Sequence, residues 1–397
     1  MAEFLDLLES VRADQASVST LFGDAGVGVR HGAMRESVEY QRRLAEAAGL
    51  LGDVMAGRRP DYLLREAMTT SDFPLLFGDI MDRAVLASYR EYTPVWENFA
   101  QARTVRDFRT VNVFRLDGAE SVLTAVPERT EYPMASLTET RYQLTVGKYG
   151  RALQFSWETM INDDLDSFAT LPARLGRAAR RTEQRVMTTL YVDGSGPHAS
   201  MFTVGNANIV TGNPALSIAG LQTAFGKLAA QTDADGEPIL IEAVELVVPP
   251  ALEMTALSIV NATELIIDPN ATAGTAQQQI KTANWIRQRV RVSVDPYIPA
   301  IATTANGSTS WFLFASPSNG NPSLIGARLR GHDAPEVFIK ESNQRRVGGA
   351  GLNPLDGDFA TDTVDYKVRH AFGGARANPK MAVSSNCLLY TSPSPRD

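Results

Sequence analysis

Ser195, His198 and Ser200, in the stretch DGSGPHAS, are the residues whose types and spacing come nearest to nucleophilic catalysis. A serine becomes a nucleophile when a base lies within hydrogen-bonding reach, and closeness in sequence does not ensure that geometry. The G-x-S-x-G elbow of serine hydrolases is absent, because Gly194 and Gly196 flank Ser195 directly. We therefore predict a hinge loop after a long helix here, and no catalytic residue.

The histidines are scattered along the chain as His31, His198, His332 and His370, without an HxxxH or HxH pair. Metal binding and acid–base catalysis need side chains that converge at fixed spacing. The sequence therefore predicts structural or solvated histidines, and neither a metal nor another cofactor.

Glycines that could cradle a phosphate also lack the required context. Gly26, Gly28 and Gly32 form G-x-G-x-x-x-G, which differs from the dinucleotide-binding fingerprint and follows no buried strand. Two Gly-Lys pairs, at 147–148 and 226–227, are not followed by the Ser or Thr of a Walker-type loop. We expect ordinary loops at these positions.

A basic run between residues 174 and 185 is a candidate for nucleic-acid binding. It contains Arg174, Arg177, Arg180, Arg181 and Arg185. Bases are usually gripped by aromatic side chains interleaved with the charges, and this run contains none. The sequence therefore favours a solvated face of a long helix, or salt bridges to neighbouring subunits.

Composition narrows the class of protein further. The 397 residues are 44% hydrophobic and 21% charged, which is ordinary for a folded chain and is enough for two or three domains. The net charge of −7 differs from the basic balance of proteins that wrap DNA, although an acidic wall would leave enclosed DNA free to slide. No apolar run approaches the roughly 18 residues of a membrane span, and the acidic, mixed N-terminus is unlike a signal peptide.

The single cysteine, Cys387, opens the C-terminal string CLLYTSPSPRD. This string resembles the translation of a sequencing-library adapter, and its alternating Ser and Pro depart from the composition before it. We interpret residues 387–397 as an artefact and expect the natural chain to be cut short near Asn386. No disulfide or thiolate chemistry is then expected.

The N-terminal part alternates between helical and apolar stretches. Apolar residues recur at three- to four-residue spacing within residues 1–58, which predicts two helices around the glycine-rich stretch 23–32. A dense apolar run then covers Phe73–Met81 and precedes a helical stretch through Tyr89. Such a run needs a partner surface to cover it.

The clearest strand pattern lies at 137–149. Thr138, Thr140, Tyr142, Leu144 and Val146 alternate with polar residues and share one face. An outgoing leg at 104–116 is rich in β-branched and aromatic residues, and turn-forming residues lie between the legs. We predict a long β-hairpin with legs of about 15–20 residues. A two-stranded ribbon is marginal in water, so neighbouring copies of the chain would have to complete it.

A strand and a long helix follow the hairpin. Alternating apolar residues predict the strand at 151–160, and Asp163 or Asp164 is a candidate cap for a first helical turn. Pro172 suits the first turn of a longer helix. The buried stripe of that helix is expected at Leu175, Ala179, Val186 and Leu190.

From Asp193 onward the pattern is α+β. A helix is expected at 251–261, opened by Pro249 and Pro250, and a glutamine-rich loop at 271–279. Strands are expected at 240–250, 289–294, 311–315, 324–329, 336–342 and 364–372.

This order of parts resembles the Hong Kong phage 97-type major capsid fold, and within it the Mu-like major head subunit group. The resemblance covers about residues 62–376, and its most specific stretch is Trp157–Tyr191. It implies an α+β subunit with a long "spine" helix and an extended hairpin called the E-loop. Residues 1–58 match no known part.

The resemblance assigns a role to each region. It implies an N-arm at 59–102, an E-loop at 103–149, an axial domain at 236–305, and a peripheral domain formed by 150–235 and 306–376. Residues 1–58 would be a helical segment that guides assembly as a built-in scaffold and is later removed by a maturation protease.

The resemblance also implies the partners. Copies of the chain would form the hexamers and pentamers of an icosahedral shell in the virion, assembled in the host cytoplasm, with a portal protein at one vertex and a decoration protein outside. Double-stranded DNA would be enclosed without sequence-specific binding. Some members of the family cross-link an E-loop lysine to a neighbour. Here the first lysine is Lys148, at the base of the hairpin, so we expect a noncovalent shell.

Two alternatives stay open from the sequence. An encapsulin, a bacterial nanocompartment that encloses a cargo enzyme, would share the fold, although encapsulins usually begin with a short helix. A soluble hydrolase would use Ser195 and His198 and would lose its activity when Ser195 is replaced.

Overall fold

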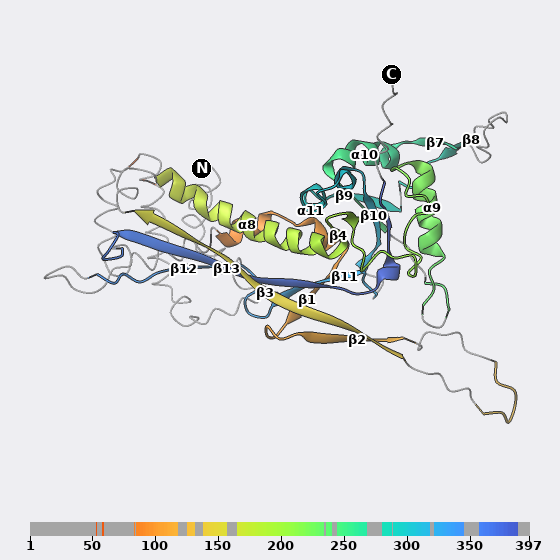
Figure 1. Cartoon of the computed structure of the whole chain (residues 1–397), viewed down its shortest axis with the longest axis horizontal. Coiled ribbons are helices and arrows are strands. Elements are labelled where there is room, and N and C mark those ends of the chain that lie inside the picture. The colour runs from red at the N-terminus through yellow and green to blue at the C-terminus, as the bar shows by residue number, and fades with distance from the viewer. Residues whose placement is uncertain are drawn as a thin grey trace, which may run out of the picture.

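The structure is a computed structural model of the whole chain, viewed in Figure 1. It describes residues 85–117, 125–131, 138–156, 165–233, 236–239, 244–267, 280–287, 289–317, 321–344 and 357–387, with single residues 53, 58 and 83. The expectations for residues 1–58 and for the loop at 271–279 therefore lie outside the described residues. So do Gly26, Gly28, Gly32, His31, the apolar run Phe73–Met81, the candidate caps Asp163 and Asp164, and most of the hairpin tip.

The described chain mixes helices and sheets, as the predicted α+β class requires. Its larger sheet has six strands, in the order β1-β11-β13-β3-β2, with β12 also paired to β13. These strands are β1 (Gln101–Val105), β2 (Val111–Asp117), β3 (Thr138–Ser156), β11 (Leu324–Leu329), β12 (Glu336–Ile339) and β13 (Thr363–Arg376). β1 is parallel to β11, and the other pairs are antiparallel.

β3 and β13 form the backbone of this sheet. Their antiparallel ladder is continuous from Thr363–Ser156 to Gly374–Thr145, and Figure 1 shows the two strands running the length of the molecule. Alternation sets their faces: Leu144 and Val146 are buried, whereas the polar residues between them are exposed. The predicted alternation at 137–149 is confirmed, but it belongs to one strand of 19 residues that also contains the strand expected from residue 151.

The outgoing leg of the hairpin is shorter than predicted. Residues 104–116 do not form one strand, because Gln101–Val105 pairs in parallel with β11 and the chain then turns before β2 begins at Val111. The described ribbon pairs Val111–Asp117 with Thr138–Leu144. β-branched residues are equally suited to both pairings, so composition alone placed the two short strands in one leg.

One long helix, α8 (Leu165–Tyr191), lies along the sheet (Figure 1). Pro172 was expected in its first turn, and that expectation is wrong, because the helix begins seven residues earlier, at Leu165. The predicted buried stripe is right at Leu175 and Ala179, whereas Val186 and Leu190 are only half-buried. The centre of the buried stripe is polar, as described below.

The second sheet has four strands in the order β14-β10-β6-β9. They are β14 (Ala382–Ser385), β10 (Trp311–Ala315), β6 (Val244–Val248) and β9 (Val290–Val294). β6, β10 and β14 are buried along their whole length, as their continuous apolar runs indicate. Two helices, α9 (Ile218–Ala229) and α10 (Glu253–Asn261), lie beside this sheet (Figure 1), and Ser217 caps α9 by accepting a hydrogen bond from Gly220.

The expected boundary at residue 306, between the axial and the peripheral domain, does not coincide with the division of the strands between the two sheets. That boundary would put Trp311–Ala315 with the returning strands of the larger sheet, whereas β10 pairs with β6 and β14 in the smaller one. The helix α9 also packs with the smaller sheet, although it precedes residue 236. The sheet to which each element belongs depends on partners far apart in the sequence, and the local sequence pattern does not reveal those partners.

Short elements complete the described fold. They are η1 (Val95–Asn98), β4 (Val192–Asp193), β5 (Gly196–Pro197), η2 (Pro250–Leu252), β7 (Glu264–Ile267), β8 (Ile280–Ala283), α11 (Ile298–Ile301), η3 (Ala305–Ser308) and η6 (Pro379–Met381). As predicted, Pro249 and Pro250 open the helical stretch of η2 and α10.

An aromatic core joins the two sheets beneath the end of α8. Phe99 stacks on Phe314 with ring centroids 4.7 Å apart, and Tyr191 meets Phe312 edge-on at 5.0 Å. These four rings are fully buried. Phe99 follows η1, Tyr191 is the last residue of α8, and Phe312 and Phe314 lie in β10. The cluster that contains them includes residues of both sheets, so it fixes α8 against both.

Candidate functional site

Ser195 and His198 lie in the turn around β4 and β5 and have different hydrogen-bond partners. The Ser195 hydroxyl donates to Asp193 Oδ1 at 2.6 Å, and His198 Nδ1 accepts from the Ser200 amide at 3.1 Å. Hydrogen bonds from Ser195 and Ala199 lower the pKa of Asp193, although partial burial opposes them. The stretch is a hydrogen-bonded turn in which the Ser195 hydroxyl donates to a carboxylate, whereas a nucleophilic serine needs a base within reach.

The other described histidines each pair with one glutamate. His332 Nδ1 contacts Glu336 at the start of β12, where both residues are half-buried, and His370 Nε2 lies 2.9 Å from the buried carboxylate of Glu183. Within the described ranges, no three side chains of metal-ligating type converge. The structure thus brings none of the three described histidines together with another.

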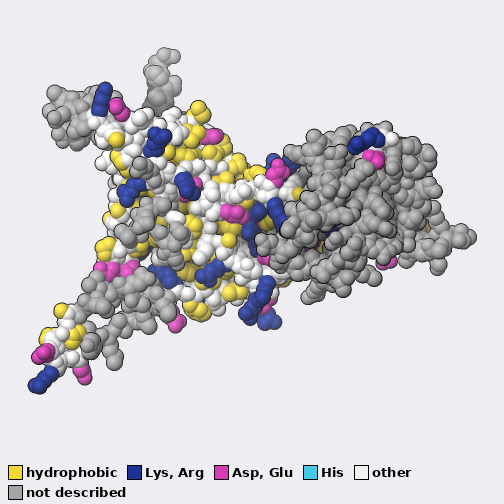
Figure 2. Space-filling view, turned by 180° about the vertical axis from the view of Figure 1, so that it is seen from behind, with side chains coloured by type: hydrophobic (Ala, Val, Ile, Leu, Met, Phe, Trp, Pro, Cys, Tyr) yellow, Lys and Arg dark blue, Asp and Glu magenta, His cyan; other side chains and the backbone are white. Residues whose placement is uncertain are grey.

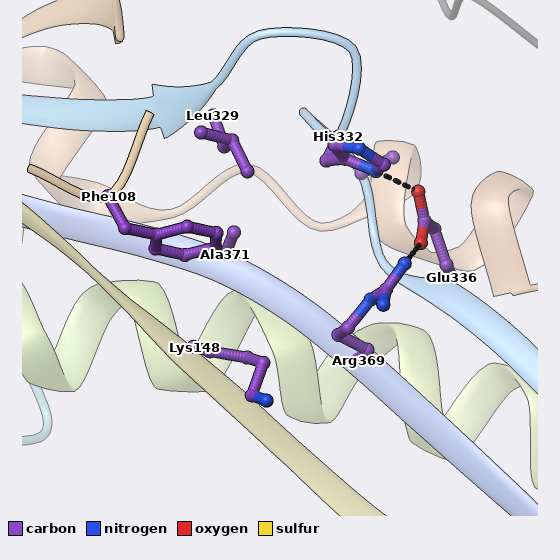
Figure 3. A pocket seen from close by; sticks show the side chains of 8 residues that line it. Phe108, Lys148, Leu329, His332, Glu336, Arg369 and Ala371 are labelled. Carbon is purple, nitrogen blue, oxygen red and sulfur yellow. Dashed lines mark hydrogen bonds and ion pairs between the residues drawn. The ribbon is translucent and has the colours of Figure 1, made fainter. Parts of the chain in front are cut away.

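A cavity of about 250 Å³ opens on the face of the larger sheet that points away from α8 (Figure 3). Phe108, Lys148 and Arg369 line it together with the His332–Glu336 pair. Arg369 Nη2 donates to Glu336 at 2.5 Å, and the hydrogen bonds from Arg369 and His332 lower the pKa of Glu336 against the effect of its partial burial. Glu336 therefore compensates the charge of Arg369 within the subunit.

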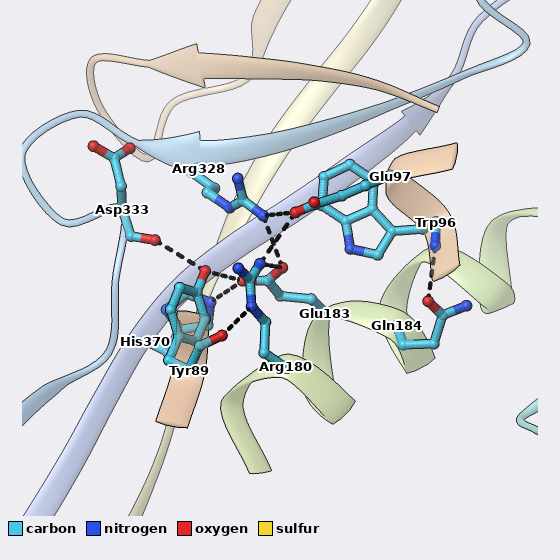
Figure 4. Close-up of polar contacts among 9 residues, drawn as sticks. All are labelled: Tyr89, Trp96, Glu97, Arg180, Glu183, Gln184, Arg328, Asp333 and His370. Carbon is cyan, nitrogen blue, oxygen red and sulfur yellow. Dashed lines mark hydrogen bonds and ion pairs between the residues drawn. The ribbon is translucent and has the colours of Figure 1, made fainter. Parts of the chain in front are cut away.

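The functional core that sequence reasoning missed is a buried ionic cluster on α8 (Figure 4). We call it the Glu183 cluster, and its members are Tyr89, Glu97, Arg180, Glu183, Arg328 and His370. They come from the helical residues 85–91, η1, α8, β11 and β13. The cluster therefore joins the segment before β1 to the long helix and to the centre of the larger sheet.

Glu183 is fully buried at the centre of the cluster. Its Oε1 accepts from the Tyr89 hydroxyl at 2.5 Å and contacts His370, and its Oε2 accepts from Arg180 at 3.2 Å and Arg328 at 3.1 Å. Burial alone would raise its pKa, but His370 and Arg328 lower the pKa of Glu183 to about 2. The carboxylate thus stays ionised in the interior.

Two arginines close the cluster from either side. Arg180 Nη1 also donates to Glu97 at 3.1 Å, and Arg328 Nη2 to Glu97 at 2.6 Å, so two carboxylates face two guanidinium groups. Arg180 additionally lies 3.8 Å from the centre of the Tyr89 ring and donates to the Tyr89 carbonyl at 2.8 Å. Buried charges are tolerated when they are paired and hydrogen-bonded in this way.

A second polar group continues the same stripe of α8. Gln184 accepts from the Trp96 amide at 2.9 Å and donates to Asp295 at 2.8 Å, and Thr188 donates to Asp295 at 2.6 Å. Tyr191 also donates to Asp295, which directly follows β9. Burial and the charge of Asp295 raise the pKa of Tyr191 well above its usual value. Polar contacts of α8 therefore reach the smaller sheet as well.

The signal for this polar stripe was present in the sequence. Arg180, Glu183, Gln184 and Thr188 continue the three- to four-residue spacing that starts at Leu175 and Ala179. A search for apolar residues alone skips them and selects the half-buried Val186 and Leu190 instead. Of the five arginines in the basic run, Arg180 is buried and the other four are exposed.

The β2–β3 ribbon is the second candidate functional feature. Figure 1 shows it leaving the body of the molecule beyond the end of the larger sheet. One face is packed, because Val111, Val113 and Tyr142 rest on the cluster that contains Leu144 and Val146. On the other face Phe114 is 58% exposed, an unusual position for a large aromatic side chain. Among the described strands, none pairs with the outer edge of β2.

Comparison with known proteins agrees with this architecture. A model of the family described as phage capsid protein matches residues 140–385, which is more than half of the chain. The chain therefore belongs to the phage capsid protein family. No curated protein matches it. None of the helices in the described residues is long and apolar enough to cross a membrane.

Similar solved structures are distant in sequence. One from Gordonia phage Cozz is 14% identical and aligns over 72% of this chain and 83% of that chain, with a TM-score of 0.44. One from Mycobacterium phage Patience is 13% identical over 80% and 90%, with a TM-score of 0.41. A virus-like particle from Pyrococcus furiosus is 12% identical over 78% and 98%, with a TM-score of 0.40.

Proposed function

We propose that this protein is the major capsid protein of a tailed phage, a structural subunit without catalytic activity that builds the virion shell from copies of itself. The match to the phage capsid protein family over residues 140–385 carries this proposal. It also favours a phage shell over the encapsulin-type compartment that the sequence left open.

The shape of the subunit supports self-assembly. A strand of 19 residues greatly exceeds the usual length of about five or six, and its first residues pair only with β2. The outer edge of β2 offers unpaired backbone groups next to the exposed Phe114. A neighbouring subunit that covers the outer edge of β2 and the Phe114 ring would pair the free backbone groups and bury the exposed aromatic side chain.

The parts of the subunit take their roles from this proposal. Residues 103–149 would be the E-loop, and residues 59–102 the N-arm, whose described part is held by the Glu183 cluster. The larger sheet with α8 would be the peripheral domain, and the smaller sheet the axial domain, with β10 and α9 added to it. Hexamers and pentamers of this subunit would enclose double-stranded DNA, with portal, maturation protease and decoration proteins as partners.

Electron microscopy of the purified full-length protein tests the proposal. We expect closed shells or rings of subunits, and a protein that stays monomeric and folded at high concentration would refute it. Phe114→Asp places a charge on the contact face and should abolish assembly while circular dichroism stays unchanged. Val204→Asp is the matched control, because Val204 is 88% exposed on a loop far from the ribbon in sequence, and assembly should persist.

Residues 1–58 offer a separate test of their proposed role in assembly. Peptide mass spectrometry of mature particles should lack peptides from this region if it is a scaffold removed by a protease. Intact peptides from Phe4 to Arg58 in the particles would contradict that removal and leave the shell proposal untouched.

A further inference from the structure

The exposed side of α8 carries an unusual pattern of charge. Arg174, Arg177, Arg181 and Arg185 are all exposed. At about 100° per residue, the four lie within an arc of about 80° on one side of the helix. We call this set the arginine stripe. It is about 16 Å long at a rise of about 1.5 Å per residue.

The stripe lacks acidic counterparts. The acidic residues of α8 are Asp166, near its N-terminus, and Glu183, which is buried on the opposite side. Among the residues that the structure describes, no carboxylate pairs with any of the four guanidinium groups of the stripe. Four like charges along one helix face are unfavourable by themselves, so the stripe is suited to a polyanion.

Aromatic side chains, absent from the run itself, are supplied by other segments. Burial raises the pKa of Tyr297, the positive charges of Arg181 and Arg185 act in the opposite direction, and Tyr92 adds to the effect of burial. Tyr297 therefore lies within electrostatic range of Arg181, Arg185, Tyr92 and the buried Asp295. Tyr297 is half-buried, so part of its side chain remains accessible.

The opposite side of the larger sheet differs in its charge balance. There Arg369 pairs with Glu336, and Lys340 lies 3.2 Å from Asp365. Figure 2 shows the molecule from behind, with cationic and anionic side chains interspersed over the described part of that surface. On α8, by contrast, four exposed arginines lie together without an acidic partner among the described residues.

We propose that the arginine stripe of α8 binds the phosphate backbone of duplex DNA. This inference rests on the proposed function, and it implies that the α8 side of the subunit faces the enclosed DNA. A stripe of about 16 Å exceeds the roughly 12 Å width of the major groove, so its arginines reach the phosphates on both sides of the groove. Phosphate contacts of this kind carry no sequence preference.

The salt dependence of DNA binding tests the stripe directly. The variant combines Arg177→Gln, Arg181→Gln and Arg185→Gln, since glutamine keeps the helix propensity. Fluorescence anisotropy of labelled duplexes with unassembled full-length subunits gives the affinity over about 50–200 mM salt. Each lost phosphate contact reduces the slope of log K against log salt by about 0.9, so the loss of three contacts should make the slope shallower by about 2.7. Two duplexes of unrelated sequence should bind equally.

The matched control removes the same charge elsewhere. Arg109→Gln, Lys148→Gln and Lys367→Gln together neutralise three exposed cations, with Lys148 and Lys367 on the sheet face opposite α8. We expect the salt slope of this control to equal that of the wild type. An unchanged slope in the stripe variant, or an equal change in the control, would overturn the proposal. Binding of polyglutamate but not of duplexes, lost in the stripe variant, would assign the stripe to an acidic polypeptide and also overturn it.

Electron microscopy of the same preparations separates the two proposals. If the wild type forms shells while the stripe variant keeps its DNA affinity, the DNA-binding inference alone fails. If the wild type forms no shells or rings, the proposed function fails, whatever the DNA measurement shows.

Discussion

Glu183 Oε1 and His370 Nε2 lie 2.9 Å apart in the interior, although 187 residues separate them in the sequence. This contact fixes the middle of α8 to the middle of β13. The same carboxylate receives Tyr89, so the segment before β1 is fixed at the same point. The largest effects of single substitutions are therefore expected around Glu183.

Replacing Glu183 by glutamine should destabilise the subunit strongly. The change leaves the buried Arg180 and the half-buried Arg328 with one carboxylate, Glu97, for two guanidinium groups. Removing one partner of a buried ion pair typically costs about 3–5 kcal/mol. Urea unfolding of the unassembled subunit measures the loss, and Glu341→Gln, at an exposed glutamate, serves as the control with an expected change below about 0.5 kcal/mol. Equal stability of the two variants would contradict the central role of Glu183.

The stability that Glu183 contributes should depend on pH in a defined window. Its pKa is lowered in the folded protein from 4.5 to about 2, so its contribution is complete above the unfolded value of 4.5. It is then lost as the pH falls through about 2, and it amounts to roughly 3 kcal/mol in total. Unfolding curves of the wild type and of Glu183→Gln should accordingly converge between these pH values. A difference that stays constant down to pH 2 would rule this out.

Gly326 should not tolerate even one added methyl group. A Cβ atom there would lie 2.7 Å from the Trp96 ring, which packs on β11. Gly326→Ala is expected to cost about 1–3 kcal/mol from overpacking. Gly226→Ala in α9 is the matched control, because nothing lies within 4 Å of its Cβ position, and it should gain up to about 1 kcal/mol from helix propensity.

A double variant identifies Trp96 as the cause of that loss. If the ring is the obstacle, Gly326→Ala combined with Trp96→Phe should lose less stability than the sum of the two single changes. Additive losses would mean that the cost at Gly326 arises elsewhere.

Assembled shells should fall apart into single chains in a denaturing gel. The segment between β2 and β3 contains no lysine, and Lys148, the first lysine of the chain, lies within β3 opposite Ala371. A hairpin tip without a lysine cannot supply the amine of an amide link to a neighbouring subunit. A ladder of covalent oligomers from purified particles would contradict this expectation.

Local pattern predicted the elements whose periodicity is strong. The alternation around Leu144 and Val146, the buried run at Trp311–Ala315 and the start of the buried stripe at Leu175 all follow from side-chain spacing. What could not be predicted depends on distant partners. Gln101–Val105 is a separate strand because Leu324–Leu329 lies beside it, and β10 joins the smaller sheet because of β6.

The site shows the same division. Ser195 and His198, which were set aside because the elbow motif was absent, bond to Asp193 and to Ser200 in the folded chain. The Glu183 cluster was missed because its charges are far apart in sequence and neutralise one another only in the folded chain. Tyr297, which lies within electrostatic range of Arg181 and Arg185, was missed for a related reason, since it approaches the run only in three dimensions.

The unbroken course of β3 couples the ribbon mechanically to the sheet. A single backbone runs from the paired residues of the ribbon to Ser156, with no loop to act as a joint. A force or torque on the projecting end of the β2–β3 ribbon is therefore transmitted through the β3–β13 ladder to the contact between α8 and β13. The ribbon cannot swing like an independent arm, so any change in its angle must be absorbed by twist spread over the larger sheet.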